Sequence, residues 1–469
     1  MTRRTSPVPF ALTILTVASF AACSCGDGGD DPPGGGGDGG ATRCDVPLEG
    51  RIRITEVDVG TNVVANEDEA GLRPIVIAPI ASGGSRLAFM GGDGDVHVVT
   101  LDASDHLTGS ATTIAANDFS DLRADADGGV LLLTRDALAG GTHHCGTLTN
   151  LCGASDALPT DAACSDMYMV RFDGSTETWA TKLTDASVAH PPYLNSPTDS
   201  ENVTFVWWYA HHGRIATDGD RFAAYYGAAI SVSQACGVGS ANATGVNIHQ
   251  GDQMRVLDAD GTIVSGGFDW GCSHSGYEHI VWDAAASEFV TVCKTDNQNR
   301  IAIAPGYDTI RPVDLAYSNF GGIVAVGSVR WLITSDRRAG EPAMSNGDAE
   351  VHLLRFEDGL AAQDVVVASA AGENHRAPHL AAYGDGLLLA LWESSTASGD
   401  LAANDAARAM FVRTYDAANG APVGAAVPVS GVRGNRYHDL RAFPDGSAAF
   451  PARSTAANTV TVMRVMPCE

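Results

Sequence analysis

The residues best suited to chemistry are histidines and an aspartate concentrated in one stretch of the chain. They lie in WWYAHHGR from Trp207, NIHQGDQM from Asn247 and DWGCSHSGYEHI from Asp269. Neutral imidazoles and a carboxylate together can hold Zn²⁺ or another divalent metal ion. No pair has the i, i+4 helical spacing of known metal motifs, so surface or hydrogen-bonding histidine is the alternative, and no cofactor is specified. The candidate metal ligands are His211, His249, Asp252 and His274.

Aromatic residues are interleaved with these histidines. Aromatic faces beside Arg, Asp and His suit sugar rings, which present apolar patches and hydroxyls together. Packing of a tryptophan between sheets is the alternative at each position. The stretch therefore predicts a polar-ligand site formed by Trp208, Tyr209, His211, His212, His249, Asp252, Trp270, His274 and His279.

The elements that must position these residues form a repeat. In each copy a polar residue leads into an aliphatic strand, a turn and a second apolar run, as in SDLRADADGGVLLLTRD from Ser120 and HDLRAFPDGSAAFPARS from His438. Third and fourth strands follow, joined by Asp-Gly turns that favour tight hairpins. We predict an all-β fold, a seven-bladed β-propeller with four-stranded antiparallel blades. The copies are at Val76-Ile77, Asp121-Leu122, Arg214-Ile215, His279-Ile280, Asp314-Leu315, His379-Leu380 and Asp439-Leu440.

The two ends of the propeller domain are expected to close the ring. The seventh copy ends in TVTVMRVMPCE and has no fourth strand, whereas RIRITEVDV from Arg51 precedes the first copy without a partner. Pairing these segments removes an open sheet edge. The register also places Cys44 near Cys468, so we predict a closing disulfide between them.

The connections between strands two and three, and between blades, carry nearly all the variation in length. Binding residues tend to lie on such loops, so the face that carries them is predicted to be the functional one. Residues that open the innermost strands gather at the same mouth and predict a charged pocket for a polar ligand. Pairing among themselves is the alternative role. These residues include Asp121, Arg214, His279, Arg311, Asp314, Arg376, His379, Arg436 and Asp439.

The N-terminus has the features of an export signal. Arg3 and Arg4 precede an apolar stretch that ends in Phe20-Ala21-Ala22-Cys23, which resembles the lipobox of bacterial lipoproteins. The resemblance implies a signal peptide at 1–22, lipidation of Cys23, and a membrane contact through that lipid. Because residue 24 is Ser and not Asp, the resemblance implies that the lipoprotein is located at the outer membrane. Ordinary cleavage and free secretion are the alternative.

Residues 23–43 are rich in Gly and Asp and predict a disordered tether, which leaves 44–469 as the propeller domain. The formal net charge is −27, which excludes nucleic-acid partners on electrostatic grounds. An exported chain with ten cysteines favours disulfides. Two of Cys145, Cys152 and Cys164 should pair, and Cys236 and Cys272 are a plausible second pair.

The sequence therefore predicts a lipid-anchored, monomeric propeller that acts as a binding or scaffold module. Its partner would be a glycan, a peptide or another component of the cell envelope, held on the long-loop face. The alternative is a polysaccharide lyase or hydrolase that uses the His/Asp cluster, with or without a metal ion. No nucleophile motif, paired-carboxylate pattern or cofactor fingerprint identifies a reaction.

Overall fold

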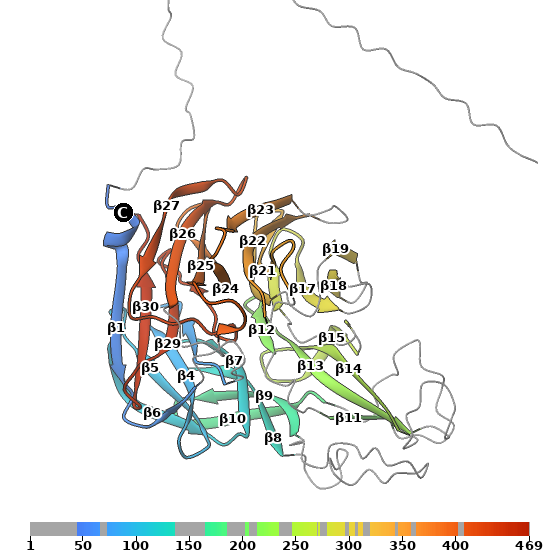
Figure 1. The fold of residues 1–469 in the computed structure, drawn as a ribbon. Helices are drawn as coiled ribbons and strands as arrows, with labels where there is room; N and C mark the ends of the chain where they lie inside the picture. The colour runs from blue at the N-terminus through green and yellow to red at the C-terminus, as the bar shows by residue number, and fades with distance from the viewer. Residues whose placement is uncertain are drawn as a thin grey trace, which may run out of the picture. The chain divides into compact units, whose positions relative to one another are not determined.

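The strands of the propeller domain form seven antiparallel sheets arranged as blades around a central channel (Figure 1). The computed structural model describes residues 45–65, 73–136, 165–184, 202–205, 213–233, 246–269, 271–272, 279–295, 300–304, 308–312, 319–342, 346–357, 363–401 and 408–468. All of them belong to one unit, Arg43–Glu469. The predicted seven-bladed, four-stranded propeller is confirmed.

Blades one to three each run from an innermost to an outermost strand along the chain. Blade one has an extra strand, β2 (Val63–Val64), beside β4, and blade three has β11 (Asn202–Phe205) beside β13. The strands are β3 (Val76–Pro79), β4 (Ser85–Gly91), β5 (Val96–Leu101) and β6 (Leu107–Ile114); β7 (Asp118–Ala124), β8 (Gly128–Asp136), β9 (Ser165–Asp173) and β10 (Thr176–Lys182); and β12 (Arg214–Thr217), β13 (Phe222–Ser233), β14 (Val246–Leu257) and β15 (Ile263–Phe268).

Blades four to six repeat this order, and blade seven has three strands from the C-terminal end of the chain. The strands are β16 (His279–Asp283), β17 (Glu288–Thr295), β18 (Arg300–Ala304) and β19 (Asp308–Pro312); β20 (Asn319–Val326), β21 (Val329–Arg337), β22 (Ala349–Phe356) and β23 (Gln363–Ala368); β24 (Asn374–Tyr383), β25 (Leu387–Ser395), β26 (Arg408–Asp416) and β27 (Pro422–Val429); and β28 (Arg441–Ala442), β29 (Ala448–Arg453) and β30 (Thr459–Val465).

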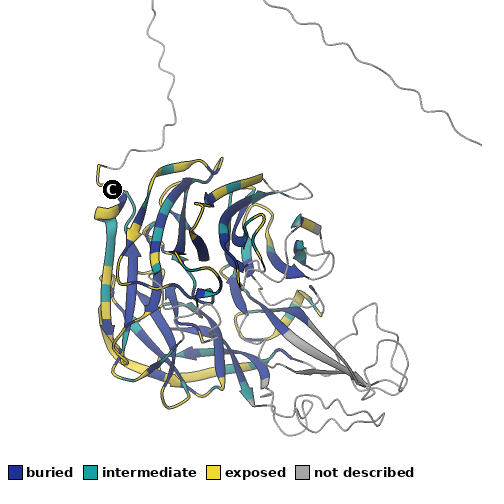
Figure 2. Ribbon diagram, in the orientation of Figure 1, coloured by how far each residue is buried: buried dark blue, intermediate teal, exposed yellow. Residues whose placement is uncertain are grey.

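In blades one, two, three, five and six the outermost strand is more exposed than the innermost strand, which explains the sequence pattern of the strands. The second strand of blade one, β4, is buried along its whole length, whereas the outermost strand, β6, is mostly exposed (Figure 2). Strands sandwiched between neighbouring blades must be apolar on both faces, so they appear in the sequence as aliphatic runs. The described residues contain no helix with the length and hydropathy that crossing a membrane would require.

The ring closes as the sequence predicts. After a short 3-10 helix (Leu48–Arg51), β1 (Ile52–Asp58) pairs antiparallel with β30 and completes blade seven. A buried carboxylate reinforces this closure, because Asp105 of blade one accepts hydrogen bonds from Arg464 of β30 at 2.9 Å and from Arg53 of β1 at 2.6 Å. The two ends of the domain are thus joined to each other and to the first blade.

Blade five differs from the prediction in its register. Its innermost strand is β20, so the predicted start at Asp314-Leu315 is wrong; residues 313–318 themselves lie outside the described residues. The residues that line the channel in blade five are Gly322 and Ile323. The residue before them, Gly321, must be glycine, because a Cβ on it would overlap the main-chain carbonyl oxygen of Pro378 in β24.

Candidate functional site

The innermost strands bring polar residues from separate blades together inside the channel. Five of the residues predicted to open the innermost strands lie there: Asp121 on β7, Arg214 on β12, His279 on β16, His379 on β24 and Asp439 just before β28. In each blade this residue precedes an aliphatic one, and side chains alternate along a strand. The polar residue therefore faces the channel. Its aliphatic neighbour packs in the core between blades, and Ile280, Leu380 and Leu440 also reach the cavity wall.

Four charged side chains are connected by ion pairs: Asp121, Arg214, Asp439 and Arg441. We call these four, together with the nearby Arg123, the channel cluster. Arg441 contacts Asp121 at 2.5 Å and Asp439 at 2.6 Å, and Arg214 contacts Asp439 at 3.1 Å. Asp121 also accepts a hydrogen bond of 2.7 Å from the main-chain N–H of Ile215. The cluster thus links blades two, three and seven across the channel.

Arg123 stands apart in this cluster. Its guanidinium donates a hydrogen bond to the main-chain oxygen of Ile215, and no carboxylate of the described residues lies within ion-pairing distance of it. Burial, followed by the nearby Arg441, lowers the pKa of Arg123 to about 10. The residue therefore stays charged at neutral pH and brings into the channel a cation that has no ion-pair partner among the described residues.

The sequence-based prediction did not include Arg123 or Arg441, although a signal for both was present. Blades two and seven share the tetrapeptide Asp-Leu-Arg-Ala, at Asp121 and at Asp439. With a side-chain period of two, the arginine must face the same side of the strand as the aspartate. The repeated tetrapeptide would have identified two arginines beside two channel-facing aspartates.

A cavity of about 670 Å³ lies within the channel beside this cluster. Its walls include Arg123, Arg214, Arg441, Asp439 and His279 together with apolar side chains. The rim is formed by residues at the ends of the innermost strands, namely Ala81, Asp125, Gly219 and Trp282. The cavity therefore opens on the face that carries the short turns, whereas the sequence placed the functional pocket on the long-loop face.

Electrostatics fix the charge state of this site. Burial by itself would raise the pKa of Asp439, but Arg214 and Arg441 outweigh burial and hold that pKa well below its usual range. Burial opposes the charge of Arg441 as well, but Asp121 and Asp439 raise its pKa. Asp439 and Arg441 are therefore both charged at neutral pH.

Three buried histidines surround the cluster and are uncharged. Burial lowers the pKa of His279, His379 and His438 to about 3 in each case. The rings of His379 and His438 lie 4.7 and 5.8 Å from the ring of Phe450. Neither ring forms a hydrogen bond of normal geometry within the described residues, although main-chain groups of Asn435 and Pro451 lie near them.

Two of the predicted arginines, Arg376 and Arg436, form contacts that hold loops and neighbouring blades together. The guanidinium of Arg376 is buried and donates to Asn374 at 2.9 Å and to the main-chain oxygen of Gly347 at 3.0 Å, and it pairs with Asp400. Arg436 stacks on the ring of Tyr437 and contacts Asn319 of blade five. Both fasten one blade or loop to another, which is the alternative role that the sequence left open.

Arg311 is the third predicted residue that lies outside the channel cluster. It belongs to β19, the outermost strand of blade four, and pairs with Asp336 at 3.3 Å and Asp364 at 3.0 Å. The prediction that it opens the innermost strand of blade five is wrong, because that strand begins only at Asn319. Arg311 instead joins the outer part of blade four to blade five.

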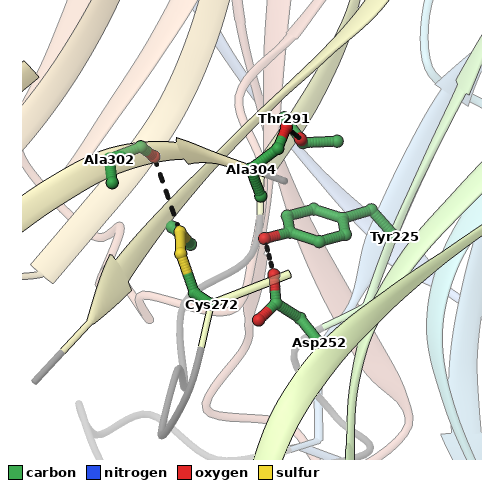
Figure 3. Close-up of a disulfide and its surroundings, with 7 residues drawn as sticks. Tyr225, Asp252, Cys272, Thr291, Ala302 and Ala304 are labelled. Carbon is green, nitrogen blue, oxygen red and sulfur yellow. Dashed lines mark hydrogen bonds between the residues drawn. A yellow bond between two sulfur atoms is a disulfide. The ribbon is translucent and has the colours of Figure 1, made fainter. Parts of the chain in front are cut away.

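Asp252 was predicted as a ligand on the loop face but is fully buried between blades three and four. Its carboxylate accepts a hydrogen bond from the hydroxyl of Tyr225 and lies beside the disulfide between Cys272 and Cys293 (Figure 3). The Cα atoms of the two cysteines are 6.2 Å apart. The suggested pairing of Cys272 with Cys236 is therefore wrong. Asp252 and the two sulfur atoms are close enough to ligate a metal ion, but the sulfur atoms are committed to the disulfide.

The remaining predicted residues cannot be placed. His249 lies on β14, but its side chain is outside the described residues. Cys468 is disulfide-bonded, while its predicted partner Cys44 is outside the described residues, so that pairing stays a prediction. Also outside them are Cys23, Cys145, Cys152, Cys164, Trp208, Tyr209, His211, His212, Trp270, His274 and Asp314.

No family model and no curated protein matches the chain. Among solved structures, it is similar to a Penicillium chrysogenum alpha-L-arabinanase complexed with arabinobiose, with 10% identity, 88% of this chain and 98% of that chain covered, and a TM-score of 0.39. A protein of unknown function from Dyadobacter fermentans shows 11% identity over 88% and 98% of the chains, with a TM-score of 0.38. The Dos1 propeller shows 11% identity over 81% and 76%, with a TM-score of 0.34. The fold assignment rests on the strand order, and no activity follows from these likenesses.

Proposed function

We propose that this protein is a propeller binding module that holds an anionic ligand in its central channel. The observation that carries the proposal is Arg123, a cation that lines the cavity and has no carboxylate partner among the described residues. A partly buried charge without a counter-ion is costly, and an anionic ligand would supply one. Guanidinium groups are also the side chains best suited to bind a carboxylate or phosphate with two parallel hydrogen bonds.

The charge of the whole chain makes this site distinctive. The formal net charge is −27, yet the channel cluster carries three arginines against two aspartates. Low-dielectric walls focus the field of such a cluster, so the channel attracts anions that the outer surface repels. This contrast supports selective binding of a small anion that can enter the channel, as opposed to a large polyanion.

The ionisation states favour binding over catalysis at this site. A general base needs a pKa near the working pH, and that of His279 is about 3. The carboxyl of Asp439 is held ionised by Arg214 and Arg441, so it has no proton to donate as a general acid at neutral pH. These properties support the binding module over the lyase or hydrolase alternative.

Calorimetric titration of the full chain in detergent with acetate and with sulfate tests the proposal. Arg123→Gln should weaken anion binding by roughly tenfold or more, because it removes charge-assisted hydrogen bonds. Arg413→Gln is the matched control, since Arg413 lies on β26 and donates to the main-chain oxygen of Gly424, away from the cavity. Equal anion affinity in the parent chain, Arg123→Gln and Arg413→Gln would contradict the proposal, and so would the absence of anion binding by the parent chain.

We further propose that the module is displayed in the cell envelope through a lipid on Cys23, most simply at the outer membrane. The lipobox-like sequence before Cys23 supports this. Incorporation of labelled fatty acid by the parent chain, and its loss in Cys23→Ala, is the expected result. A glycan or protein partner on the long loops, through Trp208 or Trp270, stays a prediction that binding to a glycan array can test.

A further inference from the structure

We propose that the ligand of the channel is a monoanionic carboxylate attached to a ring-sized apolar body, and that it enters from the short-turn face with its carboxylate innermost. The inference rests on the proposed function and specifies its ligand class. Three features of the cavity carry it: its charge balance, its apolar walls and the aromatic residues at its rim.

The charge balance favours a single negative charge. Within the described residues, Asp121 and Asp439 neutralise two of the three guanidinium groups, and His279 is uncharged. One positive charge therefore remains in the cluster, centred on Arg123. The other acidic residue of the cavity lining, Asp125, pairs with Arg171. A monoanion brings the buried site to neutrality, whereas a dianion would leave an excess negative charge in a poorly solvated place, which is costly.

The inner end of the cavity fits the shape of a carboxylate. Arg123 and Arg441 come from equivalent positions of blades two and seven, and both line the cavity with Arg214. Each guanidinium is planar and presents donors in a fork that matches two carboxylate oxygens. Since Arg214 and Arg441 already hold Asp439, Arg123 has the most donor capacity left for a ligand.

The walls between the cluster and the rim are apolar. They include small or aliphatic residues of several blades, among them Pro79, Ala216, Ile280, Ile323 and Leu440. A strongly hydrated ligand such as a free inorganic anion would lose its water against these walls without compensation. A ring with carbon faces would instead bury apolar area and remove the walls from water.

The rim adds aromatic surface where the body of the ligand would lie. Phe222 and Trp282 are both partly exposed and line the cavity on the short-turn side. The ring of Trp282 is held by Phe289, with centroids 4.8 Å apart, and by Arg221, whose guanidinium carbon lies 6.0 Å from it. A held aromatic ring can stack on a ligand ring with little loss of side-chain freedom. The volume of about 670 Å³ is typical of a pocket for a small organic molecule.

Calorimetric titration of the full chain in detergent with four probes tests the inference: benzoate, acetate, sulfate and benzyl alcohol. Benzoate should bind most tightly. Benzyl alcohol, which has the ring but no charge, should bind roughly tenfold or more weakly. Acetate, which has the charge but no ring, should also bind more weakly than benzoate, and so should the dianion sulfate.

Two substitutions assign the two halves of the ligand. Arg123→Gln should weaken benzoate and acetate by the same factor, because both lose the same carboxylate contact. Trp282→Ala should weaken benzoate several-fold and leave acetate unchanged. If Arg123→Gln fails to fold, as judged by circular dichroism, Arg123→Lys keeps the charge but loses the fork and should weaken benzoate.

The outcomes separate the inference from the proposed function. Sulfate binding as tightly as benzoate, or acetate binding as tightly as benzoate, would overturn the ligand class while leaving an anion-binding channel in place. Benzyl alcohol binding as tightly as benzoate would overturn both, and so would the absence of binding by every anion tested.

Discussion

Acidification from pH 7 to pH 5 should destabilise this propeller strongly, because three histidines are buried without charge near the channel. Burial lowers the pKa of His279, His379 and His438 to about 3 in the folded chain. In the unfolded chain each returns to a pKa of about 6.5. Above pH 6.5 both states are uncharged and the histidines have no pH effect. Below pH 6.5 only the unfolded state takes up protons, so stability falls.

The size of the effect follows from proton linkage. Each histidine loses about 1.4 kcal/mol of folding free energy per pH unit between the two pKa values. Between pH 7 and pH 5 this comes to about 2 kcal/mol for one histidine and about 6 kcal/mol for three. Asp439 has a lowered pKa, so its contribution is lost only as the pH falls below its usual value of about 4, outside this interval. The expected loss is comparable with the whole stability of many domains.

Urea unfolding at pH 7 and pH 5, followed by tryptophan fluorescence with disulfides intact, measures the loss. His279→Gln and His379→Gln should each reduce the difference between the two pH values by about 2 kcal/mol, whatever their effect at pH 7. His106→Gln is the control, because the side chain of His106 is 71% exposed. If both buried-site variants keep the full difference of the parent chain, the buried neutral histidines are not its cause.

Three further substitutions test the ring and its blades, each by urea unfolding at neutral pH. Asp105→Asn should cost about 3 kcal/mol or more, since it leaves the buried Arg464 without its carboxylate, and a loss below 1 kcal/mol would contradict a closing role. Gly321→Ala should destabilise by more than the roughly 1 kcal/mol typical of a single substitution, because a Cβ there overlaps the neighbouring blade; wild-type stability would refute that contact. Replacing Cys272 and Cys293 by Ser should cost about 3 kcal/mol under oxidising conditions and nothing under reducing ones, given the 21-residue separation of the pair.

The blades were predictable because their signals are local. Alternation of side chains and short turns act over a few residues, and they gave the inner hairpins of blades one to four, six and seven. The closing strand was predictable for the same reason, since β1 and the last blade each had an unpaired edge. Blade five was misplaced because Asp314-Leu315 has the local pattern of the repeat, while the close approach of Pro378 to Gly321 involves another blade.

The sequence by itself determined the class of fold, the closing pair of strands and several polar residues that face the channel. Only the tertiary structure decided which of these residues meet. The contact between Arg441 and Asp121 joins residues 320 positions apart, and it exists because ring closure brings blade seven back beside blade two. Cys272 pairs with Cys293 for a similar reason, since the packing of blade three on blade four sets that distance. Strand formation is encoded by near neighbours, whereas the charge and opening of the cavity depend on how seven separate strands converge.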